Sequence, residues 1–247
     1  MQNIRLNIMF DGTNYYGMQI QKNKPTIVGE LKKALHSLFN KDIELNYLGR
    51  TDKGVSAEIM VANFFVDTKI KPENISFALN QFLPKDIKVI SSCLVDEKFN
   101  ARKSVKSKTY CYSLYESKTE LPIYPYETMI KSNLNYKNMK KAIKYFKGTK
   151  DFTSFVTPSC EMDNKVRTIF NVKIVKETIN NINHYKFYFT GNGFLYNQVR
   201  IMVGTLVMVG LNKIKPKDIK KILLAKNRGL AGAVMKPQGL KLVDVKY

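Results

Sequence analysis

An arginine and an aspartate lie two positions apart in the polar segment LGRTDKGVSA, which separates two apolar runs. Arg50 would favour the ionised form of Asp52, because a nearby positive charge lowers the pKa of a carboxyl group. An ionised carboxylate in a cleft can act as a nucleophile or as a general base. Gly49 and Gly54 would allow a tight backbone course. Taken alone, the segment also fits a surface turn in which Asp52 caps the next element and Arg50 is solvated.

Two further side chains could take part in chemistry. Tyr110 alternates with Tyr112 in the segment KTYCYSL, which on its own is typical of an aromatic residue in a half-buried strand. Arg200 stands in an otherwise apolar helical segment, where a charge is costly unless it is paired or reaches a cleft. We expect Asp52 to be its partner, and an exposed stripe of the helix is the alternative. Gly204, one turn further, could allow close approach of another backbone.

The composition indicates a folded protein with a polyanionic partner. Hydrophobic residues make up 44% of the chain and charged residues 25%, which is typical of a globular domain. The 41 Lys and Arg against 20 Asp and Glu leave a formal charge of +21, which favours nucleic acid through counterion release from phosphates. A coding bias is the alternative explanation, since the chain is rich in Lys and Asn and lacks Trp.

The cysteines and histidines suggest neither a disulfide framework nor a metal site. Cys93, Cys111 and Cys160 are odd in number and form no CxxC pair, so we expect a reducing cytoplasm. His36 and His184 are far apart, and we expect no metal and no redox cofactor. The start MQNIRLNIMF lacks the features of a signal peptide, and polar residues interrupt the most apolar stretch, so we expect no membrane insertion.

Hydrophobic periodicity predicts the order βαββαβ for the first half of the chain. The predicted strands lie at residues 4–8, 43–48, 59–66 and 87–95, and the predicted helices lie at residues 27–39 and 72–82.

The second half approximates the same order with one added helix. The predicted strands lie at residues 109–116, 167–175, 184–189 and 241–247. Helices are predicted around 139–146, where Gly148 ends the helix, from about 194 to 209, and after Pro216.

This repeated order predicts an α+β fold with two ferredoxin-like (βαββαβ) halves, whose sheets lie side by side with the active-site cleft between them. Residues 1–103 would form the N-terminal half, with the Asp52 loop. Residues 104–247 would form the C-terminal half, with Tyr110 and the Arg200 helix. The boundary is expected within residues 98–108, where KFNARKSVKSK is basic and lacks periodic apolar positions.

Five separated segments, in order along nearly the whole chain, resemble the tRNA pseudouridine synthase A family, whose members act on the tRNA anticodon stem-loop. The segments are FDGTNYYGMQIQ, GRTDKGVSA, FNARKSVKSKTYCY, GNGFLYNQVRIMVGTLVMVG and AGAVMKPQGLKL. The resemblance implies conversion of uridine to pseudouridine at tRNA positions 38, 39 and 40, without a cofactor. It also implies a cytoplasmic homodimer in which one tRNA can touch both subunits.

The resemblance also implies roles for the four residues named above. Asp52 would be the nucleophile that holds the detached base or sugar, at ribose C1′ or at pyrimidine C6, and both routes remain open. Tyr110 would stack on the target base and assist proton removal from C5. Arg50 would fill the space that the flipped uridine leaves. Arg200 lies in the matching helix motif, which supports its pairing with Asp52.

Two segments match regions of the family that contact RNA. The first comprises Phe99, Asn100, Ala101, Arg102 and Lys103, within a basic stretch from Lys98 to Lys108 that could neutralise phosphates. A solvated linker is the alternative for Lys106. The second is EMDNK, residues 161–165, whose composition is weakly diagnostic.

Four residues depart from the family pattern. Phe10 stands where Tyr is usual, Met18 where Trp is usual and Ser56 where His is usual, and Lys108 replaces an Arg. None of these changes removes the four residues expected to carry the chemistry. They bear on the packing around the site and on the grip on RNA, because Lys cannot reproduce the bidentate fork of Arg.

Two other classes of function compete with this interpretation. Paired βαββαβ units with a basic surface would also suit a non-catalytic RNA-binding module, but the RNP1 pattern of such modules does not occur in the chain. An enzyme that uses its carboxylate on a small substrate would leave the charge of +21 unexplained.

Overall fold

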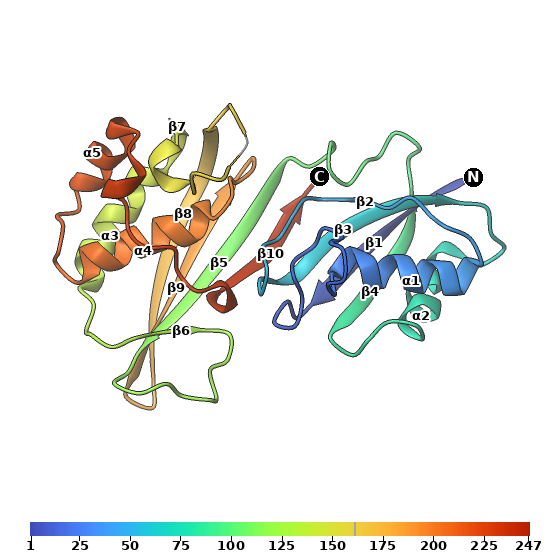
Figure 1. The fold of residues 1–247 in the computed structure, drawn as a ribbon, viewed down its shortest axis with the longest axis horizontal. Helices are drawn as coiled ribbons and strands as arrows, with labels where there is room; N and C mark the ends of the chain where they lie inside the picture. Colours follow the sequence, from blue (N-terminus) through green and yellow to red (C-terminus); the bar gives the residue numbers. More distant parts are fainter. Residues whose placement is uncertain (161) are drawn as a thin grey trace. The chain divides into compact units, whose positions relative to one another are not determined.

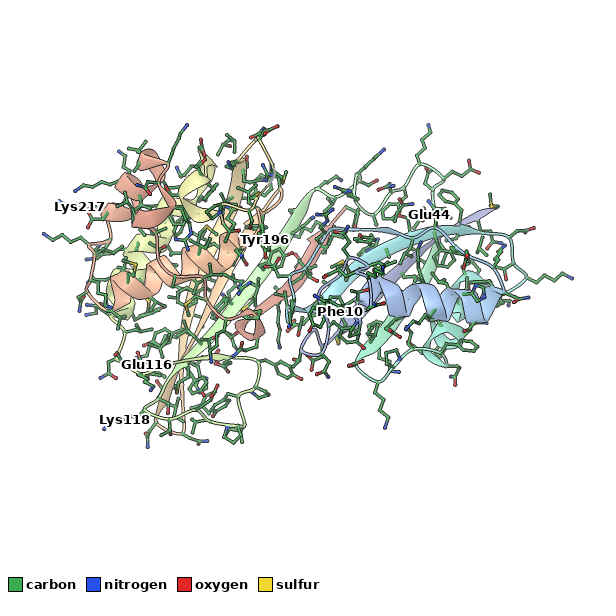
Figure 2. All side chains as sticks on the ribbon, viewed as in Figure 1. Phe10, Glu44, Glu116, Lys118, Tyr196 and Lys217 are labelled. Carbon is green, nitrogen blue, oxygen red and sulfur yellow. The ribbon has the colours of Figure 1, made fainter. Side chains whose placement is uncertain are left out.

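The computed structural model describes residues 1–160 and 162–247 and divides the chain into two compact units (Figure 1). Unit 1 comprises Met1–Lys106 together with Leu242–Tyr247, and unit 2 comprises Ser107–Lys241. Each unit combines a β-sheet with helices, so the fold is of mixed α+β class. Lysines such as Lys118 and Lys217 are exposed and extend outward from unit 2 (Figure 2).

The sheet of unit 1 has the strand order β4-β1-β3, and β1 is antiparallel to both neighbours. The short strand β2 and the last strand β10 both pair with β3, on the edge that β1 leaves open. The strands are β1 (Gln2–Phe10), β2 (Asn46–Tyr47), β3 (Ser56–Val66), β4 (Ile87–Val95) and β10 (Leu240–Lys246).

Helices α1 (Ile27–Phe39) and α2 (Ile75–Asn80) pack on one face of this sheet, and the 3-10 turn η1 (Pro72–Asn74) precedes α2 (Figure 1). Alternate residues of β1 are buried, because successive side chains of a strand point to opposite faces. Thr26 caps α1 by accepting a hydrogen bond from the N–H of Gly29, and α1 ends at Asn40 in the left-handed conformation.

The last strand contacts N-terminal residues, although we expected residues 104–247 to form one half. Tyr247 Oη donates to the carbonyl of Ala101 at 2.7 Å, and the N–H of Lys106 donates to the carbonyl of Lys246 at 2.8 Å. The guanidinium carbon of Arg5 lies 5.0 Å from the centre of the Tyr247 ring. Residues 242–247 therefore belong to unit 1, and the boundary after Lys106 lies within the expected segment 98–108.

The sheet of unit 2 has the strand order β5-β9-β8-β7, with antiparallel neighbours throughout, and β6 is added in parallel to β5. The strands are β5 (Ser107–Glu116), β6 (Thr128–Ile130), β7 (Gly148–Asp151), β8 (Val166–Ile179) and β9 (Ile182–Gly191). Asn180 and Asn181, both with positive φ, form the tight turn between β8 and β9.

The helices of unit 2 enclose an aromatic core, in which the ring of Phe146 lies 5.1 Å from Phe155 and 6.2 Å from Phe189. Helix α4 is buried along almost its whole length. The helical elements are α3 (Tyr136–Ala142), η2 (Ile143–Phe146), η3 (Thr153–Phe155), α4 (Gln198–Gly210), α5 (Asp218–Ala225), η4 (Arg228–Leu230) and η5 (Pro237–Gly239).

Several predicted elements differ in extent. The strand expected at 43–48 is reduced to Asn46–Tyr47, and the helix expected from 194 begins at Gln198, since Asn197 has a φ of 60°. The helix expected at 72–82 starts as a 3-10 turn and ends earlier. We did not expect the short strands β6 and β7, which are too short to show an alternating pattern.

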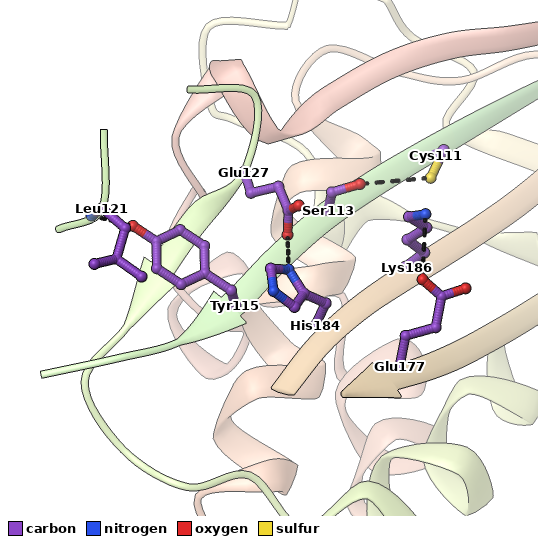
Figure 3. A network of polar contacts seen from close by, with 8 residues as sticks. All are labelled: Cys111, Ser113, Tyr115, Leu121, Glu127, Glu177, His184 and Lys186. Atoms are coloured by element: carbon purple, nitrogen blue, oxygen red, sulfur yellow. Dashed lines mark hydrogen bonds and ion pairs between the residues drawn. The ribbon is translucent and has the colours of Figure 1, made fainter. Parts of the chain in front are cut away.

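A buried histidine fastens the segment before β6 onto unit 2 (Figure 3). His184 is 3% exposed, and its Nδ1 lies 2.9 Å from a carboxylate oxygen of Glu127. The ring of Tyr124 contacts the imidazole edge-on at 4.6 Å. Tyr115 Oη accepts the N–H of Leu121 at 2.8 Å. This imidazole therefore takes part in packing contacts, outside the motifs described above.

Among residues 1–160 and 162–247, none of the helices has the length and apolar character that crossing a membrane requires.

Asp151 supports the corner between β7 and η3. Its carboxylate accepts hydrogen bonds from the N–H and the hydroxyl of Thr153, and lies 2.8 Å from Nζ of Lys226. Burial alone would raise the pKa of Asp151, but the contacts with Lys226 and Thr153 outweigh burial and lower this pKa to about 2.

We expect Asp151→Asn to lower the free energy of unfolding by about 1 kcal/mol at pH 7, since Lys226 is largely exposed and solvent screens the pair. The folded-state pKa lies below the ordinary value, so the wild-type advantage is complete above about pH 5 and is lost as the pH falls toward 2. Urea unfolding at pH 7 and pH 3 measures both. The exposed Asp67→Asn is the control, and an equal difference at both pH values would contradict the assignment.

Candidate active site

Asp52 lies in the loop between β2 and β3, at the start of the longest strand of unit 1. The N–H of Leu48 donates to the carbonyl of Val61 and anchors the beginning of the loop. The N–H of Val55 donates to the carbonyl of Asp52 at 3.2 Å and closes a turn in which Gly54 has a φ of 76°. Thr51 is buried, while Asp52 is half-buried. The backbone therefore holds the carboxylate at the margin of the core.

Residues 10–21, FDGTNYYGMQIQ, which we call the first motif, pack directly on this loop. Gly17 has a φ of 91°, and a Cβ atom there would lie 2.4 Å from the carbonyl oxygen of Thr51. The N–H of Met18 donates to that same oxygen at 3.2 Å, and the N–H of Gly54 donates to the carbonyl of Tyr15 at 3.2 Å. Only glycine fits this contact, because it lacks a Cβ and adopts positive φ without strain.

Ser56 links the same two segments through its side chain. Its hydroxyl accepts the N–H of Gly12 at 3.0 Å and lies 3.4 Å from a carboxylate oxygen of Asp11. Asp11 in turn accepts hydrogen bonds from the N–H and the hydroxyl of Thr13. Phe10 and Met18 are buried with exposed fractions of 3% and 0%. Three of the four departures from the motif pattern therefore fill well-packed positions of unit 1.

Arg50 is exposed on the same loop, two positions before Asp52. Thus unit 1 carries a cation and a carboxylate on one short segment.

The segment Phe99–Lys103 is fastened to the sheet of unit 1 by buried amide side chains. Asn63, which is 0% exposed, accepts the N–H of Ala101 at 2.8 Å and donates to Asn3 at 2.8 Å. Asn3 also donates to the carbonyl of Phe99 at 3.0 Å. The side chains of Arg102 and Lys103 are exposed. A rigid backbone therefore carries two cations into solvent.

Asn100 shapes this segment from within. Its side-chain oxygen accepts the N–H groups of Arg102 and Lys103, at 3.0 and 3.1 Å, which is the geometry of an Asx turn.

Tyr110 lies on β5 of unit 2, opposite Phe189 of β9. Its ring is half-buried and meets the ring of Phe194 edge-on, with the centroids 5.3 Å apart at an angle of 86°. Such an aromatic pair fixes the orientation of the phenol ring.

Arg200 lies in the first turn of α4 and is half-buried. Its Nε donates to the carbonyl of Met235 at 2.7 Å, and its Nη1 donates to the side-chain oxygen of Asn197 at 2.6 Å. Asn197 occupies the left-handed region just before the helix, and its side chain bonds to Arg200 instead of capping α4. The guanidinium is therefore held by two acceptors whose roles we did not predict.

Residues 231–242, AGAVMKPQGLKL, which we call the last motif, pack on α4 through glycines. This confirms the expected close approach of another backbone at Gly204. A Cβ at Gly204 would lie 2.1 Å from the carbonyl oxygen of Ala233, and a Cβ at Gly232 would lie 2.3 Å from the backbone of Gly204. The N–H of Gly232 also donates to the hydroxyl of Thr205. This contact sets the position of the Met235 carbonyl and hence of Arg200.

Tyr112 holds the same motif from the side of β5. Its hydroxyl donates to the carbonyl of Lys236 at 2.8 Å and lies 2.6 Å from the hydroxyl of Thr128. Burial raises the pKa of Tyr112 well above its ordinary value, so the phenol stays protonated and can donate.

The structure thus gathers the predicted residues into two sets, one in each unit. Unit 1 carries Asp52, Arg50 and the segment Phe99–Lys103, and unit 2 carries Tyr110 and Arg200. The pairing of Asp52 with Arg200 stays a prediction. Of the expected second RNA-contacting loop, Glu161 lies outside the described residues.

No group of three or more His, Cys, Asp and Glu with metal-binding geometry occurs among residues 1–160 and 162–247. The residues predicted to carry the chemistry are a carboxylate, two arginines and a phenol.

Comparison with known proteins gives matches over the whole chain. A family model described as tRNA pseudouridine synthase matches residues 7–102 and 142–247. The chain is 41% identical over 254 residues to tRNA pseudouridine synthase A of Caldicellulosiruptor saccharolyticus and 41% identical over 249 residues to that of Ruminiclostridium cellulolyticum. It is 40% identical over 248 residues to that of a Thermoanaerobacter species. All three matches cover 100% of both chains.

Among solved structures, an archaeal box H/ACA sRNP Nop10–Cbf5 complex contains a chain that matches 96% of this chain and 46% of its own length. The identity is 12% and the TM-score is 0.37, too low to support any conclusion.

The contact at Gly17 predicts a local effect of Gly17→Ala. A Cβ there would strain a positive φ and displace the carbonyl of Thr51, so the 51–55 turn should open more easily. We expect amide hydrogens of Gly54 and Val55 to exchange at least about tenfold faster. Gly193→Ala is the control, because a Cβ there meets only ordinary contacts. Unchanged exchange at Gly54 would show that the contact does not hold the loop.

Proposed function

The chain belongs to the tRNA pseudouridine synthase family, and on that premise we propose that it modifies uridines 38, 39 and 40 of the anticodon stem-loop with Asp52 as nucleophile. Members of this family are isomerases that act on tRNA uridine. The observation that carries the role of Asp52 is its loop, in which the first motif holds a half-buried carboxylate through backbone contacts.

The reaction conserves every heavy atom of the nucleotide and replaces the carbon-bound proton of C5 by a proton on N1. The bond from N1 to ribose C1′ breaks, the uracil turns, and a bond from C5 to C1′ forms. The proton of C5 is then released, and N1 gains a proton from solvent. A carboxylate that adds to C1′ or to C6 holds one fragment during the turn and is expelled at the end. No oxidant, reductant or added group is needed.

Preorganisation of Asp52 supports this role. A nucleophile fixed by its backbone loses little conformational entropy when the substrate binds. Arg50 is exposed beside it, and we propose that Arg50 enters the space left by the flipped uridine, which offsets part of the lost stacking.

Tyr110 and Arg200 complete the proposed site from unit 2. The ring of Tyr110 is oriented by Phe194, which suits stacking on the flipped base and contact with the C5 proton. The guanidinium of Arg200 is oriented by Met235 and Asn197. We propose that it pairs with Asp52 and keeps the carboxylate ionised, because an adjacent guanidinium stabilises the charged form.

The fold and assembly of the enzyme are parts of the same proposal. In unit 1, strands β1, β2, β3 and β4 follow the spatial order β4-β1-β3-β2, and this interleaving supports a ferredoxin-like half. In unit 2, the order β5-β9-β8 supports the second half. We further propose a cytoplasmic homodimer, whose shared groove would lengthen the basic track along the anticodon arm.

We expect Asp52→Asn to abolish release of tritium from a stem-loop labelled at uridine C5, while tRNA affinity stays within about tenfold, because the change removes the nucleophile and few phosphate contacts. Tritium release and filter binding measure the two effects. The assay contains no added cofactor. Asp67→Asn serves as a control. Parallel loss of binding and turnover would count against the role of Asp52.

Arg102→Ala should weaken binding of the stem-loop and lower the slope of log affinity against log salt by about one phosphate contact. The reason is that the 99–103 segment is rigid and presents this guanidinium to solvent. Arg102→Lys retains the charge and should retain most of the slope. If the slope of Arg102→Ala equals that of the wild type, Arg102 does not contact RNA.

A further inference from the structure

Two lysines share one aromatic ring beside the Asp52 loop. Nζ of Lys53 lies 4.0 Å from the centre of the Tyr16 ring, and Nζ of Lys24 lies 4.6 Å from the same point. Lys53 directly follows Asp52 in the chain. Lys24 directly precedes Pro25, whose carbonyl accepts the N–H of Tyr16. This hydrogen bond brings the turn that contains Lys24 close to the Tyr16 ring. We call Tyr16, Lys24 and Lys53 the two-lysine cluster.

The cluster is built on the same backbone contacts that hold the carboxylate. Tyr15 accepts the N–H of Gly54, and Gly17 packs on the backbone of Thr51 and Asp52, so Tyr16 lies between two anchored residues. Gln21 adds a further tie by donating its side-chain amide to the carbonyl of Tyr16 at 2.7 Å. The position of the ring relative to the Asp52 loop is therefore fixed within unit 1.

The two lysines give the cluster a positive charge that favours binding of an anion. A cation–π contact is attractive even at an exposed site, so Tyr16 can hold both ammonium groups near it. The two groups nevertheless repel each other, because they carry like charges and both lie close to one ring, where screening by salt over a Debye length of ~8 Å is incomplete. Within the described part of the chain, neither lysine forms an ion pair with a carboxylate. An anion held by both would relieve the repulsion.

We propose that Lys24 and Lys53 together bind one backbone phosphate of the RNA strand next to the target uridine. This inference rests on the proposed function, which places the uridine at Asp52, one residue from Lys53. A polyanion fits better than a small anion, since the group adjoining a flipped nucleotide is a phosphodiester. Tyr16 restrains both side chains in advance, which reduces the entropy lost when they engage the phosphate.

The first experiment measures binding of an anticodon stem-loop at several salt concentrations. Lys24→Ala and Lys53→Ala should each weaken binding by about three- to tenfold, and the double variant should lower the salt slope by about one phosphate contact. Lys24→Arg and Lys53→Arg should keep the slope, because Arg keeps the charge and the ring contact. Lys69→Ala is the matched control, an exposed lysine beyond the opposite end of β3.

Tyr16 is tested separately from charge. Tyr16→Leu removes the ring but neither ammonium group, so it should weaken binding while leaving the salt slope unchanged. Tyr16→Phe keeps a ring and should bind within about twofold of the wild type.

The second experiment identifies the phosphate. Stem-loops with one neutral methylphosphonate linkage, placed on either side of the target uridine, should bind the wild type about tenfold more weakly at one of the two positions. The double variant should not lose affinity at that position. If both linkages weaken the wild type and the double variant equally, the phosphate contact does not exist.

Tritium release in parallel separates this inference from the proposed function. If the wild type releases tritium and the double variant binds like Lys69→Ala, the two-lysine cluster is overturned and the proposed function stands. If the wild type releases none, the proposed function fails, and the binding data still decide whether the cluster holds a phosphate.

Discussion

The contact between the backbone at Gly17 and the backbone of Thr51 and Asp52 is the constraint on which the Asp52 loop of unit 1 depends. The proposed role of Asp52 calls for a fixed support, since each degree of freedom lost on substrate binding costs catalysis. Here the support comes from main-chain hydrogen bonds and from the absence of a Cβ at Gly17. The same contact places Tyr16 and its two lysines beside the carboxylate.

In unit 2, close packing at glycine likewise positions a charged side chain, that of Arg200. Gly204 and Gly232 let the last motif approach α4 closely, and this brings the carbonyl of Met235 to the guanidinium of Arg200. Nε and Nη1 of this half-buried guanidinium donate to Met235 and Asn197, and these two hydrogen bonds orient it. Both units therefore use backbone-to-backbone packing at glycine next to a residue of the proposed site.

The surplus of positive charge has two structural forms in this protein. Scattered exposed lysines provide a general field that attracts tRNA and is screened by salt. Arg102, Lys24 and Lys53 differ because their backbones or side chains are restrained by defined contacts. Restrained cations can select one register of the RNA strand, whereas the general field cannot, since phosphate contacts position a nucleic acid only when their own geometry is fixed.

The resemblance of five separated segments to a known family identified the residues expected to carry the chemistry. Local patterns in the sequence determined the strands β1, β3 and β4 and the helix α1, because periodicity depends on neighbours within a few positions. They did not reveal the placement of Tyr247 against Ala101, the role of Met235 and Asn197 around Arg200, or the two lysines on Tyr16. Most of these contacts join residues that are distant along the chain, and several use main-chain atoms that every residue possesses. Only the tertiary structure could decide them, because a carbonyl oxygen leaves no mark on the identity of its residue.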